Sequence, residues 1–285
     1  MPIPQQVVDQ ANAKRPVFTV TAGRSGTKFL QKLFALLPDT ASFHEPSPNF
    51  VHAMRHGQTN PAAAVDFVRD HKLPFIAAQS EARYVETSHL FCKGFAESFI
   101  RLGVVPDIIV LRRPPREIAR SLLRLNSVPA RTGLGLRYLL QPNDPGVLPL
   151  PGWEHLSNYQ LCFWYALEIE RRQMRYARIF GELGRRVVEV RLADLLSFDG
   201  FREAAGQLGF LTTAVRDLEA RFGELAKVRH NTVGQGPVPG ADSDLNAAEN
   251  AVWDGIFHYE PLLRSQIMSR YEGAPEAPVP DADAE

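Results

Sequence analysis

The sequence predicts an α/β protein in which a parallel β-sheet is flanked by helices on both faces. Short β-rich runs alternate along the chain with amphipathic runs at helical spacing, which is the pattern of strand–helix–strand units. One β-rich run, residues 107–111 (DIIVL), is almost entirely apolar, as expected of a strand buried on both faces. With 285 residues, the chain is long enough for one large domain or two small ones.

The order of the elements follows from the same patterns. Strands are expected at residues 17–21, 40–43, 83–88, 107–111 and 187–192, and helices at residues 27–37, 116–125 and 158–180. Pro38 ends the first of these helices, and Pro114 with Pro115 suits the start of the second. We expect residues 1–272 to form one domain and the tail 273–285, rich in Pro, Ala and acidic residues, to be disordered.

Composition narrows the class of protein. The chain has 32 Lys and Arg against 32 Asp and Glu, so no global basic field favours binding to nucleic acid. Its two cysteines, Cys92 and Cys162, are too few for a disulfide framework and are expected to be reduced core residues. The N-terminus lacks the apolar segment of a signal peptide, and no apolar run approaches the ~20 residues of a transmembrane segment. A cytoplasmic protein is therefore expected.

A candidate phosphate-binding loop, residues 22–28 (AGRSGTK), joins the first strand to the first helix. A strand–loop–helix turn gathers free backbone N–H groups and the positive end of the helix at one point. Arg24 and Lys28 add positive charge, Ser25 and Thr27 add hydroxyl donors, and Gly26 lets the backbone approach an anion. The spelling is not that of the Walker loop, in which Lys directly follows the second Gly. Taken alone, the loop fits a tight structural turn equally well.

The end of the fourth expected strand carries arginines. A magnesium-dependent kinase of this architecture is expected to have an acidic residue there to hold the metal. Here Arg112 and Arg113 follow the strand, and Ser121 lies eight residues after Arg113, about two helical turns along. This strand end therefore favours an anion over a metal, although a variant small-molecule or nucleotide kinase stays an alternative.

Together these residues resemble the sulfotransferases that use 3′-phosphoadenosine 5′-phosphosulfate (PAPS). The family's first motif is similar to Arg24-Ser25-Gly26-Thr27-Lys28, and its second pairs a strand-end Arg with a Ser eight residues later, as in Arg113 and Ser121. The resemblance covers roughly residues 17–45, 108–124 and 187–196. It implies a P-loop-like sulfotransferase fold of bacterial type, a 5′-phosphosulfate at the loop, a 3′-phosphate at Arg113 and Ser121, and adenosine 3′,5′-bisphosphate (PAP) as product. No metal is expected. Lys28 departs from the pattern, since the family commonly has Thr there.

Sulfuryl transfer to a hydroxyl needs a base, and residues 43–48 (FHEPSP) offer one at the end of the second strand. Glu45 lies at a distance from the loop arginine similar to that of the catalytic Glu in protein-tyrosine sulfotransferases. Other members of the wider family use His, so His44 is the alternative. Neighbouring side chains on an extended chain point in opposite directions, so only one of the two is expected to face the acceptor. The competing interpretation is that Glu45 forms a structural ion pair with an arginine of the loop.

Other polar residues are weaker candidates. Arg229, before a Gly-containing segment, is similar to the late basic loop that many sulfotransferases place near the 3′-phosphate. His89 is expected to be a satisfied interior histidine. His52 and His56 have the i, i+4 spacing of a metal pair but lack the accompanying Glu, and a solvated helix face is expected instead.

The acceptor is not encoded in a motif. Residues 126–158 are rich in Pro and Gly, and a segment of this kind is usually a lid, a binding loop or a mobile stretch. Arg131, Arg137 and Tyr138 within it suit a hydroxyl-bearing sugar, phenol or lipid-like alcohol equally well. A non-catalytic member of the family that only binds the nucleotide is a further alternative.

Overall fold

The computed structural model describes residues 3–210, 215–227 and 242–272. It contains a parallel sheet of five strands in the order β2-β3-β1-β4-β5. The strands are β1 Val17–Val20, β2 Thr40–Phe43, β3 Arg83–Glu86, β4 Asp107–Arg112 and β5 Val187–Arg191. All five expected strands are present, and their ends differ from the predicted ones by one or two residues at most. The predicted α/β class is confirmed.

Both faces of the sheet are buried, because side chains of successive residues point to opposite faces. On β1, Val17 packs into one hydrophobic cluster, and Phe18 and Val20 pack into another. The same alternation holds on β4, where Ile108 and Ile109 belong to different clusters. In register, Val17 of β1 pairs with Val85 of β3 and with Asp107 of β4. Two apolar layers therefore lie on either side of one sheet.

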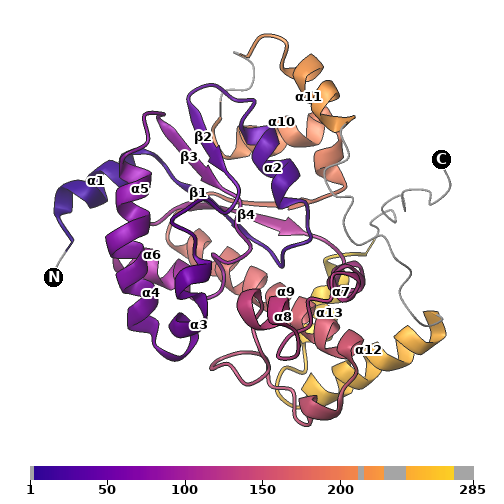
Figure 1. Ribbon diagram of the computed structural model, residues 1–285. Coiled ribbons are helices and arrows are strands. Elements are labelled where there is room, and N and C mark those ends of the chain that lie inside the picture. Colours follow the sequence, from indigo (N-terminus) through magenta and orange to yellow (C-terminus); the bar gives the residue numbers. More distant parts are fainter. Residues whose placement is uncertain (1–2, 211–214, 228–241, 273–285) are drawn as a thin grey trace.

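Helices cover each layer. The smaller cluster is formed with α2 Thr27–Phe34, α10 Phe198–Gln207 and α11 Leu218–Ala226, which gather on one side of the sheet in Figure 1. The larger cluster includes α9 Asn158–Glu182, whose first half is almost completely buried. The other α-helices, all contributing to the larger cluster, are α1 Gln5–Ala13, α3 Val51–Thr59, α4 Pro61–Phe67, α5 Leu73–Ala77, α6 Phe95–Arg101, α7 Pro115–Arg124, α8 Gly133–Tyr138, α12 Asp242–Phe257 and α13 Leu263–Ser269. Short helical turns occupy Val68–Lys72, Trp153–His155 and Asp194–Leu196.

Helix α9 fixes the point where β1 and β4 end. Gln173 on α9 is buried, and its Nε2 donates to the carbonyl of Val20 at 3.2 Å and to that of Leu111 at 3.1 Å. Tyr165 lies about two turns before Gln173 on α9, and its hydroxyl donates to the carbonyl of Ala22 at 2.9 Å. These bonds give partners to backbone acceptors at the carboxyl ends of β1 and β4 and just after β1, so the start of the loop after β1 is held in place.

Residues 126–158 are not a free loop. They contain α8, capped by Thr132, whose Oγ1 accepts from the N–H of Gly135 at 3.2 Å. Leu148 anchors the segment to α9, because its carbonyl accepts from the Trp164 indole N–H at 2.9 Å and its own N–H donates to Glu168 at 3.0 Å. The segment thus contains a helix and packs onto the core through α9.

Within the described ranges, the model has no helix both long and apolar enough to cross a bilayer. Cys92 and Cys162 are both buried and unbridged, as predicted.

Candidate functional site

A pocket of about 230 Å³ lies at the carboxyl ends of the strands. Its lining comes from the loop after β1, from the residues that follow β2 and β3, and from α7 and α8. The chain leaves β1 toward β2 at one edge of the sheet and leaves β4 toward β5 at the other edge. Strand ends where connections diverge in this way form the usual ligand crevice of open α/β sheets.

The loop after β1 has a backbone that few sequences can adopt. Gly23, Arg24 and Gly26 all have positive φ, at 77°, 56° and 89°. At Gly26 a Cβ would lie 2.4 Å from Cδ1 of Leu192, a contact that rotation of the leucine side chain can relieve, so the positive φ is the main reason for glycine. Thr27 then begins α2, which places the positive end of that helix at the pocket.

Two parts of the sequence that were predicted to bind anions meet beside the pocket, although Arg24 lines it and Arg113 and Ser121 do not. The Arg24 Nε donates to the buried Ser121 Oγ at 3.0 Å, and Arg113 donates from Nη1 to the carbonyl of Arg24 at 2.6 Å. Burial and then the charge of Arg113 lower the pKa of Arg24. The two guanidinium groups and the hydroxyl therefore form one cationic cluster, although they are far apart in sequence.

Arg113 is not open on every side. Its Nε donates to Glu117 Oε2 at 2.8 Å, one turn further along α7. Arg112, which sequence alone grouped with it, is turned away from the pocket: its guanidinium lies over the Tyr271 ring and contacts Glu189 at 3.5 Å. Of the two strand-end arginines, Arg113 alone contacts the phosphate-binding loop candidate.

The remaining loop residues have distinct positions. Gly26, Thr27 and Lys28 all line the pocket, and of these three Lys28 is exposed while Gly26 and Thr27 are buried. Ser25 is fully buried, and its hydroxyl donates to the carbonyl of Gly23 at 3.1 Å. Arg229, the proposed late clamp, lies outside the described residues.

Glu45 and His89 both line the pocket and contact each other directly. Glu45 has a left-handed backbone, with φ of 48°, and its Oε1 accepts from the His89 Nδ1 at 2.5 Å. The side chains are 18% and 15% exposed, so the contact is shielded from most of the solvent without being cut off from a ligand. The bond assigns the Nδ1 proton of His89 and leaves Nε2 as the nitrogen with an available lone pair.

The ionisation of this pair follows from its surroundings. Burial raises the pKa of Glu45, but the charge and hydrogen bond of His89, with the charges of His44 and Lys93, outweigh burial and lower that pKa to about 2. Burial and the charge of Lys93 lower the pKa of His89, against the opposing effect of Glu45. Near neutral pH the pair is therefore a carboxylate and a neutral imidazole, and the charge of His89 acts on Glu45 only in acid.

His44 also lines the pocket but is engaged by the backbone. Its Nδ1 lies 2.8 Å from the carbonyl of Thr87 and 3.4 Å from the Thr87 hydroxyl. His44 and Glu45 have different partners, but both line the pocket, because Glu45 has a left-handed backbone and not the extended one on which the prediction of opposite directions depended. Whether Glu45 or His44 serves as a base stays a prediction.

Sequence reasoning undervalued His89. It was expected to be an interior histidine, but it lines the pocket and contacts the candidate base. The signal was available: His89 lies three residues after β3, and β3 neighbours both β1 and β2 in the sheet. Polar residues that follow adjacent parallel strands meet at one edge.

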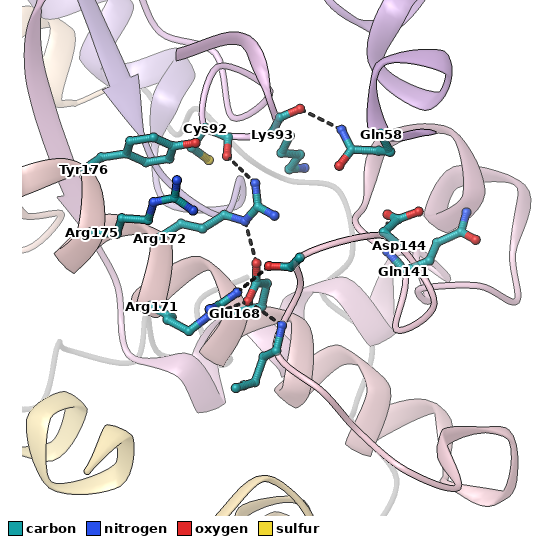
Figure 2. A network of polar contacts seen from close by, with 12 residues as sticks. Gln58, Cys92, Lys93, Gln141, Asp144, Glu168, Arg171, Arg172, Arg175 and Tyr176 are labelled. Atoms are coloured by element: carbon teal, nitrogen blue, oxygen red, sulfur yellow. Dashed lines mark hydrogen bonds and ion pairs between the residues drawn. The ribbon is translucent and has the colours of Figure 1, made fainter. Parts of the chain in front are cut away.

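Lys93 is a second residue whose position the sequence did not indicate. It is 1% exposed, its Nζ donates to the carbonyl of Tyr138 at 2.5 Å, and burial lowers its pKa to about 7. Figure 2 shows the contacts behind it: Gln58 donates to the carbonyl of Lys93 at 2.7 Å, and Arg172 donates to that of Cys92 at 2.9 Å. These bonds fix the turn that carries both Lys93 and His89.

Arg172 is itself held by Glu168, which is fully buried on α9. Glu168 accepts from Arg172 Nε at 2.5 Å and from Arg171 Nε at 2.9 Å, and it also accepts from the N–H of Leu148 (Figure 2). The network therefore ties the turn behind the pocket and the segment after α8 to one helix.

His52 and His56 are exposed on α3, as predicted. Across the residues that the structure describes, no three His, Cys, Asp or Glu side chains gather as metal ligands.

Comparison of the chain with models of known protein families gives no match, and comparison with curated proteins gives no significant similarity.

Proposed function

We propose that the chain is a sulfotransferase that moves the sulfuryl group of PAPS to an acceptor hydroxyl. The observation that carries the proposal is one pocket in which a cationic loop faces a carboxylate–imidazole pair. The resemblance of residues 24–28, Arg113 and Ser121 to the two sulfotransferase motifs supports the same assignment.

The loop is the proposed site of the group that leaves. In an in-line displacement, the bond from sulfur to the acceptor oxygen forms as the bond from sulfur to the bridging phosphate oxygen breaks. Negative charge then develops on the 5′-phosphate of PAP, so cations and N–H groups aimed at it lower the barrier. Arg24, Lys28 and the N–H groups at the start of α2 are placed to do this.

The Glu45–His89 pair is the proposed base. The acceptor proton would pass to Nε2 of His89, and Glu45 would keep the ring in the required tautomer and stabilise the imidazolium that forms. A carboxylate with a pKa of about 2 is a weak base, because an effective base has a pKa near the working pH. We therefore propose His89 as the base and Glu45 as the residue that orients it.

The size of the pocket limits what it encloses. Sites that surround a whole ligand have volumes of about 300–1,000 Å³. At about 230 Å³, the pocket suits the phosphosulfate end and the acceptor hydroxyl, and the adenosine is expected outside it. Arg113 with Ser121 is the proposed 3′-phosphate site, and there the phosphate must compete with Glu117 for Arg113.

Calorimetry with PAP in the absence of Mg²⁺ tests the proposal. We expect micromolar binding that Arg24→Ala weakens at least tenfold, because a charge-assisted contact contributes about 1.5–3 kcal/mol. Arg178→Ala is the matched control, since Arg178 is a 70% exposed arginine on α9 whose contact is with Glu182.

Three outcomes separate the alternatives. Absence of PAP binding refutes the proposal. Preferential binding of ATP with Mg²⁺, together with turnover, identifies a kinase with a variant loop. Binding of PAP without transfer from PAPS to any of a broad panel of alcohols, phenols and sugars identifies a non-catalytic nucleotide-binding protein.

A further inference from the structure

One wall of the pocket is apolar. Besides the loop and the Glu45–His89 pair, the lining includes Leu122 and Leu125, in and directly after α7, and Leu134, Tyr138 and Leu139 of the α8 segment. None of these five side chains carries a charge, and four are aliphatic. The polar reacting groups thus come from the residues that follow β1, β2 and β3, and the apolar residues come from α7 and the α8 segment.

This wall is held in place before any ligand arrives. Leu122 and Leu139 are 3% and 2% exposed and belong to the larger hydrophobic cluster. The Tyr138 carbonyl is bonded to the buried Lys93, which the contacts in Figure 2 fix from behind. A preformed wall selects ligands by shape and polarity, because it has little freedom to rearrange around a different one.

The wall lies beside the proposed base. The rings of Tyr138 and His89 have centroids 6.2 Å apart. An acceptor hydroxyl at Nε2 of His89 therefore has its carbon skeleton next to Tyr138 and the leucines. A sugar would place most of its other hydroxyls against leucine side chains, which offer no hydrogen bonds, whereas an apolar skeleton would gain from leaving water.

We infer that the acceptor is an uncharged alcohol or phenol with an apolar skeleton, and that the wall formed by Leu122, Leu125, Leu134, Tyr138 and Leu139 selects it. The inference rests on the proposed sulfotransferase function. It chooses between acceptor classes that the sequence left open, and it excludes sugars as preferred acceptors.

The test begins with acceptors that differ in polarity. Initial rates with PAPS are measured for 4-ethylphenol and cyclohexylmethanol against methyl β-D-glucopyranoside and 4-hydroxybenzoate. We expect kcat/KM for the two apolar acceptors to exceed that for either polar one by at least tenfold. Equal or greater kcat/KM for the glucoside or the carboxylate overturns the inference.

Two leucines of α8 provide a matched pair of variants. Leu134 and Leu136 are 48% and 43% exposed on the same helix, but only Leu134 lines the pocket. Leu134→Asn should lower kcat/KM for 4-ethylphenol about fivefold, equivalent to about 1 kcal/mol, because roughly half of a leucine side chain is available for the contact. Leu136→Asn should leave it unchanged. Equal effects of the two variants, or none from Leu134→Asn, overturn the inference.

The affinity for PAP distinguishes failure of the inference from failure of the proposed function. PAP binding by calorimetry should be the same in wild type, Leu134→Asn and Leu136→Asn. If PAP binds and sulfuryl transfer to the glucoside is fastest, the proposed function stands and the apolar acceptor is wrong. If PAP does not bind to the wild type, the proposed function fails and the inference fails with it.

Discussion

Replacing each member of the Glu45–His89 pair separates a base from the group that orients it. A positioned general base contributes about 10²–10⁴-fold to the rate. His89→Gln should therefore lower kcat by about 10²–10⁴-fold if His89 takes the proton. Glu45→Gln should lower kcat by less than His89→Gln does, because the Gln carbonyl can still accept from Nδ1.

The pH profile gives the sharper distinction. The His89 pKa is lowered by burial, so kcat/KM should rise with pH through a limb below pH 6.5 and then level off. The charge of Glu45 raises the His89 pKa, so its loss in Glu45→Gln should move that limb to lower pH.

The control and the contrary result are well defined. His52→Gln, on the exposed face of α3, should leave both rate and profile unchanged. Lys93, with a pKa of about 7, contributes to the same field, and Lys93→Met identifies its share of the profile. A base with a pKa of about 2 would give a flat profile between pH 5 and 8. A flat profile with full activity in His89→Gln would refute the assignment and leave Glu45 as the base.

Three further predictions concern the scaffold. Gly26→Ala should lower the melting temperature and abolish PAP binding, since its Cβ would meet Leu192 at 2.4 Å and φ is 89°; an unchanged PAP affinity by calorimetry would contradict this. In Lys72→Met, the fully buried Glu86 loses the cation that lies 3.1 Å from its carboxylate. This change should reduce the free energy of unfolding, measured by urea titration, by about 3–5 kcal/mol. An unshifted urea midpoint would show that the pair adds no stability. Burial lowers the Lys93 pKa from 10.5 to about 7, so between these two pH values the unfolded chain binds more protons than the folded one. The free energy of unfolding should therefore rise with pH over this range by up to about 1.4 kcal/mol per pH unit. Lys93→Met should remove that slope, and an identical slope in the variant would disprove the assignment.

Local sequence was sufficient for the elements that carry the site. The β-rich runs gave all five strands, and the α2 start was predicted at Thr27, where the structure has it. That helix was expected to reach Leu37 but ends at Phe34. The prediction was too long because apolar residues as far as Leu37 pack onto the smaller cluster although the α-helix has already ended. Helix ends depend on capping and packing, which periodicity does not report.

The segment 126–158 shows where composition misleads. Its Pro and Gly residues predicted an irregular stretch, but Gly135 serves a close approach, since a Cβ there would meet the carbonyl of Val128 at 1.7 Å. The segment is ordered by contacts with α9, including those of Trp164 and Glu168 with Leu148. The position of this segment beside the pocket could not be predicted, because only the tertiary structure shows that Leu134 and Tyr138 line the same pocket as His89.

The sequence by itself determined the class of fold and placed cations, hydroxyls and acids after particular strands, because backbone preferences and side-chain alternation are local properties. Tertiary structure alone decided which of those groups meet. Arg24 reaches Ser121 across 97 residues, and Glu45 reaches His89 across 44, because β1 lies between β3 and β4 and β2 lies beside β3. Strand order is set by the packing of the whole core, and it brought together a histidine that the sequence ranked low and a carboxylate that it ranked high.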